Sequence, residues 1–216
     1  MHKNIKWSKN VSYAVGLITT DGCLSKDGRH IDLTSKDINL LKDFASILEI
    51  SNKITRKIST YKPTGIYYCL QVSHANFYRF LVDIGLTPNK SRTLGPLRIH
   101  SKYFADFLRG CIDGDGNISI VKHPESQYPQ LRLRLASSSL AFLEWIKISI
   151  AQYWNIPGGF ISKAYKNTQY LTYSKADSIK LLDLIYYKGV KYYLKRKFNY
   201  YRDTMGEWRN WHTRTI

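Results

Sequence analysis

Residues 14–22 read AVGLITTDG, and residues 108–116 read LRGCIDGDG. Both stretches are largely apolar, both predict a helix, and both end in an Asp-Gly pair. In the first stretch small residues recur four positions apart, at Gly16 and Thr20, and the second stretch has glycines at the two matching places. This spacing places the small residues on one helix face, where they let a second backbone approach closely. We therefore expect the two helices to pack against each other.

Each helix is expected to end at a carboxylate, Asp21 in the first copy and Asp115 in the second. A helix C-terminus is the negative end of the macrodipole, so a carboxylate there is disfavoured unless a cation compensates it. The alternative is that the Asp-Gly pairs are ordinary turn dipeptides, in which glycine ends the helix. Because the unfavourable arrangement occurs twice, behind matched helices, we interpret the acids as functional. A calcium loop starting at Asp113 is excluded, since Ile118 stands where such a loop needs glycine.

The composition favours a globular protein that binds a polyanion. The 216 residues are 44% hydrophobic, which is enough to fill one or two modest cores. Lysine and arginine number 33 against 16 acids, a net charge of +17, and together with 14% aromatics this favours nucleic acid over a membrane surface. A basic surface without a specific partner is the alternative.

Cellular context is suggested by cysteine usage and by the absence of targeting patterns. The three cysteines are far apart, which argues against a disulfide framework and against a cysteine-based zinc site. No apolar run is long enough to span a bilayer, and residues 1–10 lack the apolar segment of a secretory signal. We expect an intracellular protein with no membrane partner.

The rest of the sequence is also duplicated. Residues 31–36, IDLTSK, parallel residues 133–138, LRLASS, and each half predicts helix, strand, strand, helix, strand, strand, helix. A basic, tyrosine-rich helix is expected at 188–202. We expect an α+β fold with a duplicated αββαββα pattern, divided into halves at 1–98 and 99–216. The motif helices lie at the interface, and two saddle-like antiparallel sheets form a groove for DNA.

Hydrophobic periodicity and breaks at glycine and proline place the individual elements. In the first half we expect helices at 11–21, 36–48 and 75–84, and strands at 22–26, 29–34, 53–61 and 66–72. In the second half we expect helices at 101–115 and 139–154 and strands at 117–122 and 130–136, followed by two strands and a helix.

Alternation along the strands separates an apolar face from a polar face. In residues 131–135, which read LRLRL, the leucines point to one side and Arg132 and Arg134 to the other. Arginine suits base edges because it can make two hydrogen bonds to guanine. Ordinary solvent-facing polar side chains are the alternative for any single position. The residues expected on or beside the DNA-binding faces are Arg29, His30, Asp32, Thr34, Lys57, Tyr67, Gln71, Lys122, Arg132, Arg134 and Lys163.

The two motif stretches resemble the LAGLIDADG homing endonuclease family, in the form that carries both motif copies on one chain. The second copy is a close match, and the first is looser, with Thr19 where the family usually has an acid. The resemblance extends over about residues 12–200. It implies a monomeric, magnesium-dependent hydrolase that cuts both DNA strands across the minor groove, leaves staggered 3′ overhangs and serves intron homing. It also implies a long, partly asymmetric target in double-stranded DNA.

The paired acids predict a metal site. If the motif helices pack together, Asp21 and Asp115 meet at one place, and Mg²⁺ prefers such oxygen ligands, completed by substrate phosphates and water. We expect Thr20 and Gly114 to contribute to the same site. Two or more divalent ions shared with the scissile phosphates would serve phosphodiester hydrolysis. Mn²⁺ is expected to substitute for Mg²⁺, and Ca²⁺ to bind without cleavage.

The resemblance also implies a catalytic lysine at the end of the second strand of a half. Lys36 matches that position and is our third catalytic candidate, together with Asp21 and Asp115. The second half has Ser138 there, which predicts unequal cleavage of the two strands.

The main alternative function is a non-catalytic nucleic-acid binder, such as an intron RNA maturase or a DNA-binding regulator built on the same scaffold. Binding alone needs only the basic surface. Retention of both acids favours the endonuclease.

Overall fold

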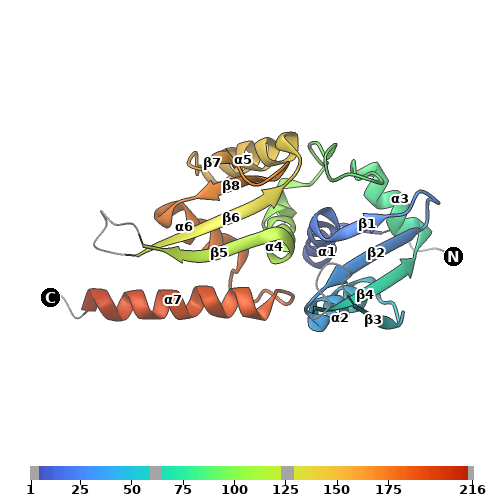
Figure 1. Ribbon diagram of the computed structural model, residues 1–216, viewed down its shortest axis with the longest axis horizontal. Coiled ribbons are helices and arrows are strands. Elements are labelled where there is room, and N and C mark those ends of the chain that lie inside the picture. The colour runs from blue at the N-terminus through green and yellow to red at the C-terminus, as the bar shows by residue number, and fades with distance from the viewer. Residues whose placement is uncertain (1–4, 59–64, 123–128, 214–216) are drawn as a thin grey trace.

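Two adjacent helices form the centre of the molecule, with one antiparallel sheet to each side (Figure 1). These helices are α1 (Lys9–Thr20) and α4 (Phe104–Asp115). The structure, a computed structural model, describes residues 5–58, 65–122 and 129–213. The predicted α+β architecture with a duplicated αββαββα order is confirmed.

The first half contains four strands and two covering helices besides α1. Its sheet has the order β1-β2-β4-β3, antiparallel throughout. The strands are β1 (Gly22–Leu24), β2 (His30–Ser35), β3 (Ile54–Ile58) and β4 (Ile66–Ser73). The helices α2 (Ile38–Leu48) and α3 (Ala75–Asp83) pack against it. Helix α2 begins later than expected because Asp37 caps it, its carboxylate accepting from Asn39 N.

The second half repeats this plan. Its sheet has the order β5-β6-β8-β7. The strands are β5 (Gly116–Val121), β6 (Gln130–Ser137), β7 (Phe160–Lys163) and β8 (Gln169–Tyr173). The helices α5 (Leu140–Trp154) and α6 (Lys175–Ile185) cover it, and a 3-10 turn, η1 (Ser101–Tyr103), precedes α4. The expected strand end at 59–61 lies outside the described residues, and the domain boundary at 98/99 stays a prediction.

Glycine sets the separation of α1 and α4. A side-chain carbon at Gly16 would lie 2.2 Å from the carbonyl oxygen of Phe107, and one at Gly110 would lie 2.3 Å from that of Tyr13. No real side chain tolerates such distances, so the backbones touch only because both positions lack one. The expected packing of the two motif helices is confirmed.

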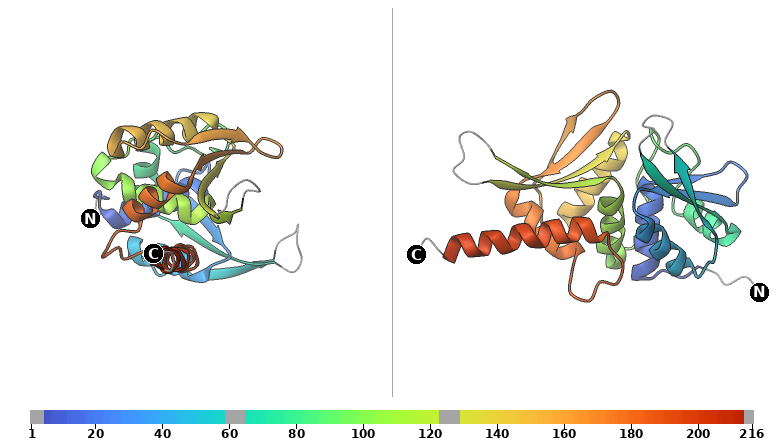
Figure 2. Two further views of the ribbon diagram at one scale, coloured as in Figure 1. Left: turned by 90° about the vertical axis from the view of Figure 1, so that its left-hand side faces the viewer. Right: turned by 60° about the horizontal axis from the view of Figure 1, so that its bottom comes forward.

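Each sheet has one buried face and one polar face. On β2, Ile31 and Leu33 are fully buried, and on β6 the three leucines at 131, 133 and 135 are buried as well. Arg132 and Arg134 alternate with these leucines and are partly exposed, as expected. In the right-hand view of Figure 2 both sheets rise on the same side of the central helices.

The final helix begins later than the sequence suggested. We expected it at 188–202, whereas α7 spans Lys195–Thr213 (Figure 1). Residues 186–194 form an irregular segment instead, with Gly189 at φ +87°. Backbone groups of this segment bind side chains of α4, which holds it out of a helix. Within the described ranges no helix is long and apolar enough to cross a membrane.

Candidate functional site

The two motif acids meet at the tips of the central helices. Asp21 is the C-cap residue of α1, and Asp115 is the last residue of α4. A side-chain carbon at Gly114 would lie 2.1 Å from Thr20 Oγ1 and 3.2 Å from Asp21 Oδ2. The tips are therefore in contact, because glycine at 114 leaves room for the opposite helix.

Burial raises the pKa of both carboxylates, and for Asp21 the charge of Asp115 adds to the effect. Partial burial, followed by the charge of Asp115, raises the pKa of Asp21 to about 6. Burial also raises the pKa of Asp115, while the nearby ammonium groups of Lys90 and Lys197 lower it. A pair of acids that is costly to ionise is a favourable place for a bound cation.

Lys197 neutralises the end of α4. Its Nζ donates to the carbonyl oxygens of Ile112, Asp113 and Gly114 at 2.6, 2.9 and 3.1 Å. These carbonyls lie in the last turn of α4, where helices leave carbonyls without a partner of their own. That of Ile112 also accepts the N–H of the C-cap residue Gly116. Burial lowers the pKa of Lys197 to about 8, although the acids around it act in the opposite direction. The ammonium thus lies where the helix dipole is most negative.

Lys90 has the corresponding place in the first half. Its side chain is buried, and its Nζ donates to the carbonyl oxygen of Gly22, the residue after Asp21. Burial lowers its pKa, while Asp21 and Asp115 raise it. Each acid therefore has a buried lysine close behind it.

Sequence reasoning missed both lysines. The signal for Lys197 was its position on the apolar stripe of the last helix, with Leu194 and Tyr201. Lys90 lies in the irregular passage between the halves, where no periodicity marks it.

Lys36, our sequence candidate, is an exposed side chain just after β2, with its Nζ 5.3 Å from the ring centroid of Tyr67. Its catalytic role stays a prediction. The second half, which has Ser138 at the matching position, supplies Lys197 to its acid instead. The sequence predicted a lysine for the first half and none for the second. The lysines that lie beside the acids do not follow this difference, because each half has one.

Two pockets border Asp115 on different sides. The linker pocket, of about 320 Å³, is lined by the passage between the halves and the end of β6. The α7 pocket, of about 400 Å³, is lined by the end of α4, the start of β5 and α7. The linker pocket includes Thr20, Lys90, Asp115, Ser137 and Ser138. The α7 pocket includes Asp115, Asn117, Arg196, Lys197 and Tyr200.

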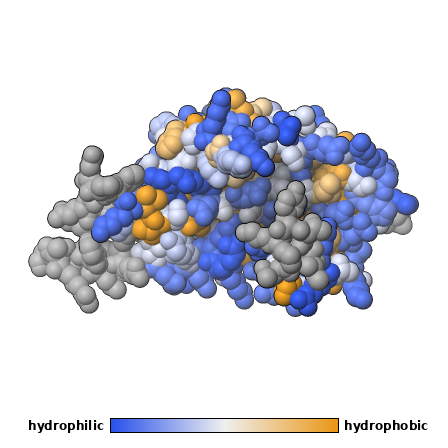
Figure 3. Space-filling model, in the orientation of Figure 1, coloured by the Kyte–Doolittle hydropathy of each residue, from blue (hydrophilic) through white to orange (hydrophobic). Residues whose placement is uncertain are grey.

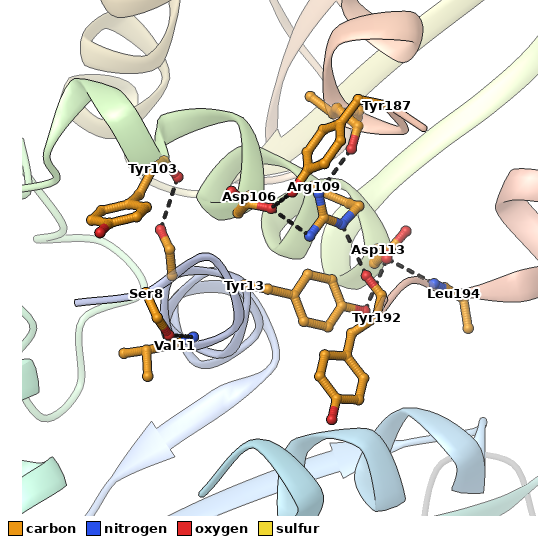
Figure 4. A network of polar contacts seen from close by, with 12 residues as sticks. Ser8, Val11, Tyr13, Tyr103, Asp106, Arg109, Asp113, Tyr187, Tyr192 and Leu194 are labelled. Carbon is orange, nitrogen blue, oxygen red and sulfur yellow. Dashed lines mark hydrogen bonds and ion pairs between the residues drawn. The ribbon is translucent and has the colours of Figure 1, made fainter. Parts of the chain in front are cut away.

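Asp113, the first acid of the second motif, has a structural position. It is fully buried and accepts hydrogen bonds from Tyr13 Oη at 2.9 Å, Tyr186 Oη at 2.6 Å and Leu194 N at 2.8 Å (Figure 4 shows the Tyr13 and Leu194 contacts). Burial raises its pKa, and these donors lower it. Asp113 therefore joins α1, α4 and the segment before α7. The matching residue Thr19 only donates to Val15 O in its own helix.

A buried ion pair one turn earlier on α4 extends this network. Arg109 Nη2 lies 2.8 Å from Asp106 Oδ1, and both side chains are only 2% exposed. The guanidinium also donates to the carbonyl oxygens of Tyr192 and Ile185 at 2.9 and 2.8 Å. Figure 4 shows Arg109 between Asp106 and the segment that carries Tyr187 and Tyr192. The segment before α7 is thereby fixed to α4.

Most of the proposed DNA-binding residues lie on the polar sheet faces. Asp32 pairs with Gln71 across β2 and β4, and Lys57 pairs with Tyr67 across β3 and β4. Paired residues share a face, so the expected placements hold for these four. Arg29 and Lys122 are exposed beside strand ends. The remaining residues placed on this side of the sheets are His30, Thr34, Arg132 and Arg134.

Lys163 is a correction. It pairs with Gln169, two residues from the buried Leu171 on β8, so the register places it on the helix-covered face rather than beside Arg134. The register of the short β7 was not readable from its four residues. Sequence reasoning also missed Tyr170, whose ring lies 5.5 Å from the Arg134 guanidinium. The DNA contacts themselves stay predictions.

His30 is engaged within the protein. Its ring Nδ1 contacts the carboxylate of Asp27, which also accepts the backbone N–H groups of Arg29 and His30. These contacts hold the pKa of Asp27 well below its usual range. An acid therefore accompanies His30 at the edge of the polar face.

The donor set at the helix tips fits a metal ion that the substrate helps to bind. In the described part of the chain no cluster of three or more His, Cys, Asp or Glu side chains is present. The carbonyl of Gly114 accepts from Lys197, and the hydroxyl of Thr20 donates to its own helix. Two carboxylates remain, which matches Mg²⁺ held by few protein ligands and substrate phosphates.

Comparison with known families and structures agrees with this geometry. Residues 11–85 match the family model described as the LAGLIDADG-like domain. This part of the chain is similar to a LAGLIDADG-like domain. No curated protein matches the sequence.

The solved structures extend the LAGLIDADG fold to both halves. The meganuclease I-AabMI bound to uncleaved DNA superposes with a TM-score of 0.61 at 16% identity, covering 94% of this chain and 91% of that chain. I-DmoI in complex with DNA and Mn gives 0.54 at 20% identity, covering 84% and 98%. The N-terminal LAGLIDADG domain of DUF199/WhiA gives 0.57 at 18% identity, covering 87% and 85%. At such identities the likeness establishes the fold and leaves the activity to the site.

Proposed function

We propose that this chain is a site-specific, Mg²⁺-dependent endonuclease that cuts both strands of double-stranded DNA as a pseudo-symmetric monomer. The observation that carries the proposal is the meeting of Asp21 and Asp115 at the tips of α1 and α4. Solved structures with this fold include homing endonucleases bound to DNA, one of them with Mn. Staggered 3′ overhangs and intron homing belong to the same proposal.

The residues of the site have distinct tasks in this scheme. Asp21 and Asp115 hold the divalent ions, which when bound activate water and stabilise the leaving oxygen. Lys197 and Lys90 sit behind the acids and keep the helix ends from repelling a phosphate. The pockets on either side of Asp115 provide two places for a phosphate, one for each strand.

The polar sheet faces would hold the duplex. Phosphate contacts supply most of the affinity, and side chains such as Arg132 and Arg134 read base edges. The face of the molecule seen in Figure 3 is mostly hydrophilic outside the grey residues, with separate apolar areas, so it shows no extended apolar surface for a partner.

Cleavage of a plasmid library tests the proposal. The library carries candidate intron insertion sites, and the protein is incubated with it in Mg²⁺. We expect linearised plasmids with 3′ overhangs, no cleavage in EDTA, and loss of cleavage in Asp21→Asn and Asp115→Asn. Asp83→Asn, at the exposed end of α3, is the control acid and retains activity. Wild-type protein that cuts no plasmid, or Asp115→Asn that cuts normally, contradicts the proposal.

A second candidate is a nucleic-acid binder that does not cleave, such as an intron maturase or a DNA-binding regulator. It is supported by the fold match with the LAGLIDADG domain of DUF199/WhiA, because the fold is not confined to proteins described as endonucleases. A splicing assay with the host intron separates the candidates. A maturase promotes splicing even when both acids are changed to asparagine.

A further inference from the structure

The two pockets beside Asp115 differ in their charged side chains. The linker pocket has the ammonium of Lys90 among hydroxyl groups from Thr20, Ser137 and Ser138. The α7 pocket has both Lys197 and the guanidinium of Arg196. The two halves are nearly symmetric, but only the second has α7, which adds Arg196 and Lys197 to its pocket.

Arg196 is available to a ligand. Its neighbour Lys197 is buried against the carbonyls of α4, whereas Arg196 is exposed and makes no hydrogen bond or ion pair within the described ranges. Its positive charge acts on one of the two acids, because it lowers the pKa of Asp21. A guanidinium presents several donors in a planar fork, a geometry that matches two oxygens of a phosphate.

Tyr200 completes the same pocket. It follows Arg196 by four positions, so both side chains lie on one face of α7. Its hydroxyl oxygen accepts from Ile120 N on β5 at 3.2 Å, which leaves the hydroxyl proton to donate to a ligand. This contact also fixes α7 against the edge of the second sheet.

The pocket adjoins the polar sheet face. Asn117 lines it and pairs across the sheet with Arg134, so both belong to the face on which we place the duplex. A phosphate in the pocket would lie at the start of β5, next to this face. Lys197 offsets the charge of Asp115 at this point, and Arg196 offsets that of Asp21.

We propose that Arg196 and Tyr200 bind one backbone phosphate of DNA in the α7 pocket, on one strand only. The inference rests on the proposed function for the identity of the ligand. The strand in the α7 pocket contacts the guanidinium of Arg196. The strand in the linker pocket contacts Lys90 and hydroxyl groups instead. The two cleavage steps are therefore unequal, and the strand in the α7 pocket is cut first.

Binding without metal tests the pocket directly. Fluorescence anisotropy in EDTA follows a short mixed-sequence DNA duplex over a range of salt concentrations. Loss of one phosphate contact in Arg196→Ala lowers the slope of log K against log salt by about 0.9. The matched control is Arg202→Ala, which removes the same charge six positions along α7, on a different face. Arg196→Lys keeps the charge and therefore most of the slope.

An unchanged slope in Arg196→Ala, or an equal fall in Arg202→Ala, overturns the proposal. Because Arg196 is exposed and has no hydrogen bond or ion pair in the part of the chain that the structure describes, the variant is expected to fold, and its melting temperature verifies this. The assay contains no metal, so a protein that binds but cuts nothing refutes the endonuclease without altering the test of the pocket.

Strand-specific labelling provides the second readout. On a duplex carrying a site recovered from the plasmid library, Arg196→Ala is expected to slow the nicking of one strand at least about tenfold, as for loss of one charged contact. The other strand is nicked at the wild-type rate. Equal slowing of both strands contradicts a contact made on one strand.

Discussion

The two motif helices are built alike at their interface and differently at their tips. Tip one has Thr19, bonded within its own helix, and Lys90, which holds a single carbonyl. Tip two has Asp113, bonded to three donors from outside α4, and Lys197, which holds three carbonyls. The difference shows that the duplication preserved what brings the acids together and changed what anchors them. The second half uses the segment before α7 as its anchor.

The buried network of the second half gives the largest expected effect on stability. Arg109→Leu removes the cation that pairs with buried Asp106, which keeps a hydrogen bond from Tyr187 Oη, and it removes the donors to two carbonyls. Leaving a buried charge unpaired costs about 3 to 5 kcal/mol. Val15→Ala, a deletion on the first helix, is the control for simple loss of packing, with a cost of about 1 to 3 kcal/mol. Urea unfolding measures both.

If Arg109→Leu lowers the free energy of unfolding by less than about 1 kcal/mol, the buried network adds little stability. The two halves would then not differ in how firmly they are anchored. Hydrogen exchange localises the effect. The amides of 186–194 are expected to lose protection first in this variant.

The two buried lysines give the next largest effect. Lys197→Met removes a donor from three carbonyls of α4, of which that of Ile112 keeps the N–H of Gly116, whereas Lys90→Met removes one donor from the carbonyl of Gly22. Each hydrogen bond from a charged group contributes about 1.5 to 3 kcal/mol. Lys197→Met leaves one more carbonyl without its donor than Lys90→Met does, so its loss of unfolding free energy is larger by about 2 kcal/mol. Equal losses in the two variants, measured by thermal unfolding, would show that the tips are anchored equally.

The raised pKa of Asp21 gives a smaller, pH-dependent effect. The folded protein binds a proton on Asp21 up to about pH 6, whereas the unfolded chain releases it near the ordinary value of 3.8. Between these values the folded state holds more protons, so its stability falls as pH rises and is constant above the window. Asp21→Asn removes this cost and is expected to be about 1 to 2 kcal/mol more stable than wild type at pH 7, after allowance for solvent screening.

The advantage of Asp21→Asn vanishes near pH 4, where the wild-type acid is protonated. Thermal melts from pH 4 to pH 8 measure it, with Asp83→Asn as the control. A variant that is equally stable or less stable at every pH would contradict the raised pKa that burial and the charge of Asp115 give Asp21.

Sequence patterns predicted most of this fold because the pattern was local and occurred twice. The glycines of the motif helices required close packing, and alternation in β6 assigned its faces before the structure did. The start of α7 could not be predicted in this way. Two hydrogen bonds decide it, one from Leu194 N to Asp113 and one from Arg109 to the carbonyl of Tyr192, and they join positions about eighty residues apart.

The acids of the site were readable from sequence, and their lysine partners were not. Asp21 and Asp115 each place a carboxylate at a helix C-terminus, where it is disfavoured, and this is visible within each motif stretch. Lys90 and Lys197 reach the same helix ends from other elements, and only the tertiary fold brings them there. Lys163 was misplaced because one-residue differences in strand register exchange the two faces of a sheet.

Titration calorimetry of Mn²⁺ tests the central claim most directly. The cell contains the protein with a duplex that carries a recovered site with a phosphorothioate at each cut position. We predict that wild-type protein binds Mn²⁺ in this complex and that Asp21→Asn/Asp115→Asn binds the duplex but no metal. Equal Mn²⁺ binding by the double variant, or none by the wild type, would contradict a metal site at the paired helix tips.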